Sequence, residues 1–331
     1  MPNLTRKELE AINLIKSERA IWTDMQVQLT DKVYFNCQNI IKKAKKNYFG
    51  VFDDQYDPVT KKKKIWLPLS RDMIETTVKN IDIDSKDISV RAKKPDSYYT
   101  AALVRYLLAA YLDKINFGQL LNRVIRKCST EGVAVLKKFN NGKNLTVSLV
   151  ENLNFLTDPT CNYLKESAGN HENHWLTNYE LSTYAWDNLD KVVGTTSVER
   201  IQNYPVPSQI PYSKITERWG IIPKNLLTQN PADKTKYTEG VIIVSNIDTN
   251  PIVHLIAENK TGKRPYQEFR TKMYDGRWLG IGVAEDLFDL QAYINEIFNI
   301  RLNTARIKQL GLFEIRKGSG ITPQKLAQLY A

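Results

Sequence analysis

The chain has 331 residues, enough for one large domain or two modest ones with a hydrophobic core, and its apolar and charged fractions are those of an ordinary globular protein. No apolar run is long enough to cross a bilayer and the charged N-terminus does not resemble a signal peptide, so we expect a protein made in the cytosol. The net charge of +11 suggests a polyanionic partner, and a lysine-rich surface without such a partner is an equal alternative.

The first two predicted elements are helices. Thr5 and Glu8 form a capping box, which starts a helix, and Ile12 and Ile15 follow at helical spacing. A second helix is predicted over residues 31–48, with its lysines mostly on one face. That face could contact phosphate, but a solvated lysine face is the simpler interpretation.

Hairpins and helices alternate in the next part of the chain. Residues 50–69 have the pattern of a β-hairpin with lysines at its turn, and Ser70 is predicted to cap the helix that follows. Residues 99–129 predict a helix that is interrupted near Asn116. Two β-rich runs then flank Asn141-Gly142, a strong signal for a hairpin turn.

The segment 151–240 is mixed, and its most notable feature is a histidine pair. His171 and His174 resemble half of a zinc site, but zinc-binding helices place histidines four residues apart and bring further ligands close. A metal site is therefore disfavoured. Residues 238–258 predict two strands joined by a turn. The three cysteines are far apart and predict reduced thiols: Cys37, Cys128 and Cys161.

The chain lacks the common signatures of enzymes. There is no phosphate-binding Gly-x-x-x-x-Gly-Lys-Ser/Thr loop and no Gly-x-Ser-x-Gly elbow, and three histidines leave little for acid–base catalysis. We therefore expect neither an enzyme nor a cofactor. One alternative stays open, since Asp53, Asp54 and Asp57 could hold a divalent metal as in a nuclease. Exposed aspartates beside a turn are the simpler interpretation.

Residues 283–307 have the pattern of one continuous helix about 37 Å long. Its apolar residues step by four and three, which favours packing on neighbouring helices: Val283, Leu287, Leu290, Ile294 and Ile297. The first part of the helix is acidic, and the stretch from Arg301 to Lys317 is mainly basic. The helix dipole explains part of this segregation, and a polyanion near the basic end would be a second cause.

The stretch 275–315 resembles the wing-to-stem junction of portal proteins, the head–tail connectors of tailed bacteriophages. The elements that carry the resemblance are Trp278, Gly280, Gly282, Glu285, Leu287, Gln291, Asn295 and Gly311-Leu312-Phe313. Upstream segments are similar to portal wing elements in the same order: 118–139, 149–161, 215–223 and 264–270. The motifs are individually weak, and the helix is the most specific of them.

The resemblance implies an α+β fold with four parts. Residues 1–48 are expected to form an N-terminal helical segment, and residues 49–280 a wing-like domain of helices and β-hairpins. Residues 281–310 would be a stem helix, and residues 311–331 the start of a clip. A portal normally continues through the rest of the clip, a second stem helix and a crown, so the chain is expected to be truncated or to have those parts on another polypeptide.

The resemblance also implies a function. Portal subunits form a ring, usually of twelve copies, through which double-stranded DNA passes during packaging and ejection. The expected partners are other copies, double-stranded DNA, the terminase large subunit, a head–tail adaptor and the major capsid protein, with no membrane. The expected location is the portal vertex of the virion, and the host cytoplasm during assembly.

Three groups of residues are candidates for these roles. Those expected near DNA are Arg301, Arg306 and Lys308, for which dipole compensation or ion pairing between subunits is an equal alternative. Those expected to bind partners at the clip are Phe313, Arg316 and Lys317. Those expected to pack helices of adjacent subunits are Leu287, Leu290, Ile294 and Ile297.

Overall fold

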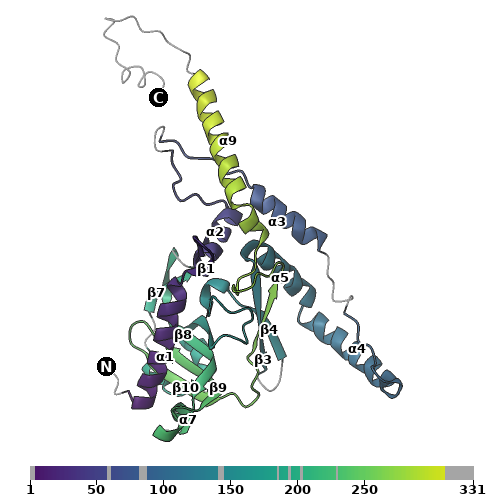
Figure 1. Cartoon of the computed structure of the whole chain (residues 1–331), viewed down its shortest axis with the longest axis vertical. Helices are drawn as coiled ribbons and strands as arrows, with labels where there is room; N and C mark the ends of the chain where they lie inside the picture. Colours follow the sequence, from purple (N-terminus) through teal and green to yellow (C-terminus); the bar gives the residue numbers. More distant parts are fainter. Residues whose placement is uncertain are drawn as a thin grey trace, which may run out of the picture.

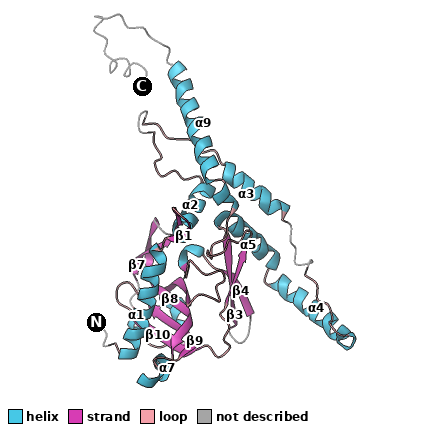
Figure 2. Ribbon diagram, in the orientation of Figure 1, coloured by secondary structure: helices cyan, strands magenta, loops and turns pink. Residues whose placement is uncertain are grey.

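A computed structural model describes residues 4–57, 61–81, 88–140, 145–184, 186–192, 195–201, 204–228 and 230–309. Figure 1 shows a body of sheets and helices from which two helices project in different directions. The mixture of helix and sheet confirms the predicted α+β class. The strands gather in the body, whereas the projecting parts are helical (Figure 2).

The helices divide between the body and the two projections. They are α1 (Arg6–Asp24), α2 (Cys37–Phe49), α3 (Leu69–Asn80), α4 (Tyr98–Lys114), α5 (Phe117–Glu131), α6 (Asn178–Ser182), α7 (Asn225–Thr228), α8 (Val283–Asp286) and α9 (Phe288–Gln309). Helix α9 extends away from the body at one end, and α4 extends from the other side beyond α5 (Figure 1). Helices α2, α3, α5 and α8 meet where α9 leaves the body, around a small apolar cluster: Ala44, Ile74, Val78, Ile125 and Ala284.

All of the strand pairs are antiparallel. The largest sheet has the order β10 (Ile252–Glu258), β9 (Tyr237–Ser245), β8 (Tyr204–Pro223), β6 (Gly169–Thr177) and β5 (Phe155–Thr157), and β7 (Thr195–Ile201) pairs with the first half of β8. A second sheet has the order β11 (Tyr266–Arg270), β3 (Val133–Asn140) and β4 (Leu145–Leu149). A two-stranded sheet pairs β1 (Val27–Thr30) with β2 (Val33–Phe35).

Helix α1 covers one face of the largest sheet. The predicted capping box is present, because the Thr5 side chain accepts from the N–H of Glu8 and the Glu8 carboxylate accepts from the N–H of Thr5. Ile12 and Ile15 are buried in the same cluster as Ile242 of β9. Since a second apolar cluster covers the opposite face of β9, this strand is apolar without alternation.

Two glycines allow the chain to enter α8 close to the end of α5. Gly132 has a φ of +82°, and a Cβ atom there would lie 2.0 Å from the carbonyl oxygen of Gly280. A Cβ on Gly280 would lie 2.4 Å from the carbonyl oxygen of Gly132. Only glycine fits such a contact between two backbones. Gly280, which precedes α8, therefore has a structural role.

Several predicted elements are confirmed. The helix over 99–129 is interrupted at Asn116, which has a φ of +50° between α4 and α5. Strands β3 and β4 correspond to the predicted hairpin, whose turn at 141–144 lies outside the described residues. Strands β9 and β10 correspond to the hairpin predicted over 238–258.

Two local predictions are wrong, and a third, the hairpin over 50–69, is confirmed only in part. Residues 31–36 are not helical, because β2 occupies 33–35 and Asn36 is the cap of α2, accepting from the N–H of Asn39 at 2.9 Å. In the described part of 50–69 the hairpin is reduced to one antiparallel bridge, between Tyr56 and Lys63. The long helix is not continuous either, because α8 ends before Leu287, whose φ of −101° and ψ of 3° separate it from α9.

A buried ion pair attaches α1 to the sheet. The Arg218 side chain on β8 is 1% exposed and donates to both carboxylate oxygens of Glu18, at 2.7 and 2.6 Å. The Nε2 atom of His171 lies 2.7 Å from the same carboxylate. Burial alone would raise the pKa of Glu18, but the hydrogen bonds and charges of Arg218 and His171 outweigh it and lower this pKa to about 2. Glu18 is therefore ionised wherever the protein is folded at ordinary pH.

Replacing Glu18 by alanine is expected to lower the free energy of unfolding by about 3–5 kcal/mol at pH 7, because it leaves the buried Arg218 without a counter-charge. Urea denaturation measures this change. Asn13→Ala, at an exposed position of the same helix, is the control and should have little effect. In the unchanged protein this stabilisation is present above pH 4.5 and lost as the pH falls toward 2. A Glu18→Ala protein with the same acid dependence would contradict the assignment.

Candidate functional site

The buried face of α9 is polar. Gln291, Asn295, Asn299 and Asn303 recur every four residues and therefore lie on one side of the helix. Gln291 and Asn295 are almost completely buried although α9 projects from the body. We call these four residues the amide ladder. A helix on a protein surface usually buries apolar residues instead, so this face needs a specific partner.

The partner of the amide ladder is the backbone of residues 61–70. Asn299 accepts from the N–H of Ile65 and donates to its carbonyl, both at 2.9 Å. Asn295 accepts from the N–H of Leu67 at 3.0 Å. Four helical residues rise about 6 Å, close to the roughly 6.6 Å spanned by two residues of extended chain. Successive amides of the helix therefore meet alternate residues of the segment.

Both ends of the ladder connect to other elements. Gln291 donates to the carbonyl of Leu67 at 2.7 Å and accepts from the N–H of Ser70 at 2.9 Å. Its side chain thus satisfies a free amide in the first turn of α3. The prediction that Ser70 caps this helix is wrong, since Ser70 lies inside it and its own hydroxyl donates to Gln291. At the other end, Asn303 donates to the Asp57 carboxylate at 3.2 Å.

The opposite face of α9 is apolar and exposed. At about 100° per residue, Leu290, Tyr293, Ile297 and Ile300 lie across the helix from the amide ladder. Their exposed fractions are 49%, 65%, 49% and 56%. We call these four residues the apolar face of α9. Two of its members, Leu290 and Ile297, belong to the predicted packing stripe, whereas Leu287 and Ile294 of that stripe are half-buried.

The structure does not bring the predicted DNA-contacting residues together. Arg301 is exposed, and it has no ion-pair partner in the part of the chain that is described. Arg306 is half-buried and donates to Asn303 at 3.4 Å, so it lies beside the amide ladder. Lys308 lies in α9, but its side chain is outside the described part. The predicted clip residues also lie outside the described residues: Phe313, Arg316 and Lys317.

Helix α4 is a second exposed apolar surface. Its exposed large apolar residues are Tyr98, Tyr99, Leu103, Val104, Tyr106 and Leu107, with exposed fractions between 44% and 85%. Leu112, near the end that meets α5, is its one buried residue. A helix that is apolar on all sides is normally buried, and α4 instead projects from the body (Figure 2). The sequence pattern indicated a helix here but gave no sign that its apolar residues are exposed.

The three aspartates of the nuclease alternative have other partners or face solvent. Asp53 forms an ion pair with Lys46, and Asp57 accepts from Asn303 of the ladder. Asp54 is exposed. Among the described residues, the group of side chains that comes close enough to hold a metal ion lies elsewhere. The aspartates therefore do not converge on one metal position.

That group consists of Glu172, His174 and Glu217, whose ligand atoms lie within 4.8 Å of one another. The ammonium group of Lys137 binds both carboxylates, at 2.9 Å from Glu172 and in close contact with Glu217. Burial lowers the pKa of His174, but the two carboxylates outweigh it and raise this pKa to about 9. Two cations thus neutralise two carboxylates, and Lys137 opposes a metal ion at this position.

His171 and His174 do not act as a pair. Both lie on β6, where residues three apart point to opposite faces. His171 binds Glu18 on the side of α1, whereas His174 faces Glu217. Burial lowers the pKa of His171, so its imidazole is neutral at pH 7.

The chain matches no protein-family model, and no curated protein matches it. No helix among the described residues is both long and apolar enough to span a bilayer. Any function must therefore be argued from the residues and their geometry. The features that demand an explanation are the amide ladder, the apolar face of α9 and the exposed α4.

Replacing Asn295 by alanine is expected to leave the N–H of Leu67 without a partner, because the Asn295 carbonyl is its acceptor. The cost of a buried unpaired donor is about 1–3 kcal/mol, so the Leu67 amide should exchange with solvent about 5–150 times faster. Hydrogen exchange followed by mass spectrometry of peptides covering 61–70 measures this change. Glu296→Ala, the exposed neighbour on the same helix, is the control. Unchanged protection at Leu67 would contradict the ladder.

Proposed function

We propose that this chain is a portal-type subunit, copies of which form a closed ring around double-stranded DNA at a vertex of a phage capsid. The observation that carries the proposal is that α9 is attached to its own chain through a polar face and leaves an apolar face uncovered. Such a helix suits the wall of a channel. Its 22 residues span about 33 Å.

The exposed apolar surfaces support assembly from several copies. A contiguous exposed apolar patch usually marks an interaction site. Ring-forming contacts join two different surfaces of neighbouring copies, and the chain has two exposed apolar helices on different sides of its body (Figure 1). We therefore expect the apolar face of α9 to be covered by an adjacent copy, with α4 available for a further contact. The subunit number is expected to be twelve, as the resemblance implies.

We assign the contact with DNA to positively charged side chains rather than to groups that recognise bases. DNA must slide through a portal, so contacts to phosphates are suitable because they are independent of sequence. Of the two arginines predicted to contact DNA, Arg301 is the better candidate, because it is exposed and has no ion-pair partner among the described residues. Arg306 is assigned to positioning the ladder through Asn303. The net charge of +11 is consistent with a polyanionic partner.

The remaining parts of the proposal follow from the resemblance. ATP hydrolysis would belong to the terminase large subunit, and the chain itself has no phosphate-binding nucleotide loop. The clip, including Phe313, Arg316 and Lys317, would bind the terminase during packaging and a head–tail adaptor afterwards, and the major capsid protein would surround the ring. The subunit would be made in the host cytoplasm and would reside in the virion. No observation on the described residues favours the nuclease alternative.

The ring is tested by placing charge on the apolar face of α9. A Leu290→Lys/Ile297→Lys double variant should remain folded but lose the ring, because lysine cannot be buried without a counter-charge. Light scattering after size-exclusion chromatography and negative-stain imaging measure the assembly. Ile21→Lys is a matched control at an exposed isoleucine of α1. Wild-type protein that stays monomeric at high concentration, or a double variant that still forms rings, would contradict the proposal.

The DNA role is tested by reversing the charge of one arginine. Arg301→Glu should lower the salt dependence of DNA binding by assembled rings, with the slope falling by about one for each phosphate that is no longer neutralised, and should impair packaging. Arg301→Lys preserves the charge and should retain both activities. Arg306→Glu should instead affect the packing of α9, because Arg306 contacts Asn303. Normal packaging by rings that carry Arg301→Glu would exclude a role for this residue in DNA binding.

A further inference from the structure

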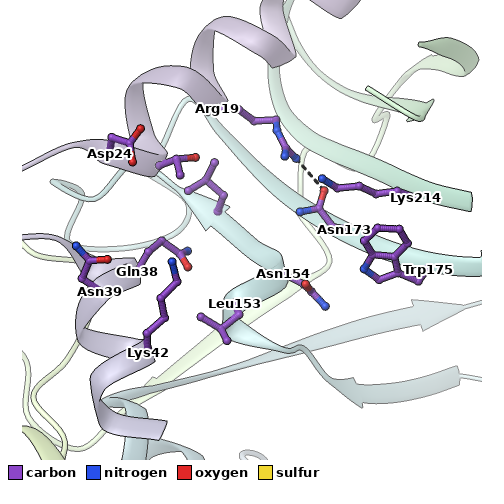
Figure 3. A pocket seen from close by; sticks show the side chains of 12 residues that line it. Arg19, Asp24, Gln38, Asn39, Lys42, Leu153, Asn154, Asn173, Trp175 and Lys214 are labelled. Atoms are coloured by element: carbon purple, nitrogen blue, oxygen red, sulfur yellow. Dashed lines mark hydrogen bonds between the residues drawn. The ribbon is translucent and has the colours of Figure 1, made fainter. Parts of the chain in front are cut away.

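A polar cleft lies where α1, α2 and the largest sheet meet, in the body of the protein and formed by residues outside α9. It has a volume of about 190 Å³. Its walls come from the last turns of α1, the first turns of α2, and strands β5, β6 and β8 (Figure 3). The side chains that matter for its chemistry are Arg19, Lys42, Asn154, Asn173, Trp175 and Lys214.

Three cations line this cleft, and two of them are held in place by neighbours. Arg19 donates to the carbonyl oxygen of the Asn173 side chain at 2.8 Å, the contact drawn as a dashed line in Figure 3. Lys214 donates to Asp248 at 2.6 Å and lies 5.9 Å from the centre of the Trp175 ring. Lys42 has no ion-pair partner within the described ranges. It is the cation most available to a ligand.

The cleft is rich in hydrogen-bond donors. The side-chain oxygen of Asn173 accepts from both Arg19 and Thr216, at 2.8 and 3.0 Å, which fixes the amide and leaves its NH₂ group as a donor. Asn154 and Trp175 add an amide and an indole N–H. The one carboxylate in the lining, Asp24, lies on the other side of the cleft from Trp175 (Figure 3). The lining also includes Gln38, whose side-chain oxygen is a buried acceptor without a partner. Donors outnumber acceptors, so a ligand here would need to supply mainly acceptors.

The charge balance also favours an anion. Arg19, Lys42 and Lys214 contribute three positive charges, and Asp24 and Asp248 remove two, which leaves one positive charge uncompensated. Burial lowers the pKa of Arg19, which means that the protein surroundings disfavour its charged form, although Asp248 partly opposes this. A bound anion would stabilise that charge. The cleft therefore has one positive charge more than the carboxylates around it neutralise.

We propose that this cleft binds a phosphate group, through Lys42, Arg19 and the amide of Asn173. A phosphate has several acceptor oxygens and matches lysine and arginine donors. The volume equals roughly six water molecules at about 30 Å³ each, and it is smaller than the roughly 300–1,000 Å³ of pockets for drug-sized ligands. It suits one phosphate group rather than a whole nucleotide. The group comes either from free inorganic phosphate or from the backbone of a nucleic acid that reaches the mouth.

Phosphate binding is tested on the full chain by calorimetric titration of inorganic phosphate in phosphate-free buffer. Saturable binding to the unchanged protein is expected. Lys42→Gln should weaken it about tenfold or more, since it removes a charge-assisted hydrogen bond. Lys43→Gln removes the same charge from the next residue of α2, which is exposed and lies over the ring of Phe288, and should leave the affinity unchanged. Equal thermal midpoints of the three proteins without phosphate establish that the fold is intact.

A second titration identifies the source of the phosphate group. Short single-stranded DNA without terminal phosphates replaces inorganic phosphate in this titration. If Lys42→Gln weakens the binding of DNA but inorganic phosphate does not bind, the cleft is assigned to a nucleic-acid backbone. Absence of saturable binding in both arms, or equal weakening by Lys42→Gln and Lys43→Gln, would overturn the proposal. Neither result bears on the ring, because the cleft shares no residue with α9 and assembly is measured separately.

Discussion

The arrangement of the projecting helix depends on the amide ladder. An amide side chain carries both a donor and an acceptor, so Asn299 satisfies the N–H and the carbonyl of Ile65 together, which a carboxylate or an ammonium group could not do. The similar rise of four helical and two extended residues repeats this contact along the helix. The segment that leads into α3 thereby obtains from side chains the hydrogen bonds that a sheet would otherwise provide. These side-chain hydrogen bonds add to the single antiparallel bridge that the segment forms, between Lys63 and Tyr56.

A consequence of this attachment is that α9 has the reverse of the usual amphipathic arrangement. Its inward face is held by hydrogen bonds, and its apolar residues, among them Tyr293 and Ile297, stay in contact with water. Complete burial of a fully exposed apolar side chain stabilises by about 1.5–3 kcal/mol, so each of these half-exposed residues would gain roughly half of that. Within the described part of the chain, this apolar surface of α9 is left uncovered. Helix α4 has the same property, whereas α1 buries Ile12 and Ile15 in the conventional way.

Local signals in the sequence predicted local structure well. The capping box at Thr5, the interruption at Asn116 and two hairpins depend on neighbouring residues, and all are present. The error at Ser70 arose because a distant residue decides the outcome there. Serine is a typical capping residue at the start of a helix. In α3, however, the free N–H of Ser70 is satisfied by the side chain of Gln291, more than 200 positions away. Four amides at spacing four were visible in the sequence, yet their buried orientation depends on a backbone segment that periodicity does not identify. Of the predicted packing stripe, Leu290 and Ile297 are exposed, whereas Leu287 and Ile294 are half-buried.

The ladder also links α9 to two other parts of the chain. Asn303 contacts Asp57, and Gln291 contacts the first turn of α3. A displacement of α9 would therefore strain or break its hydrogen bonds to the loop after α2 and to α3. The contact of Gln291 with Ser70 is buried. The contact of Asn303 with Asp57 is only partly buried, so water can replace it at a net cost of about 0.5–1.5 kcal/mol. The apolar cluster around Ile74 and Ala284, by contrast, is buried and holds the base of the helix. In the proposed ring, a buried base with a more exposed contact farther along would allow the exposed end of α9 to adjust to an adjacent copy without unpacking the body.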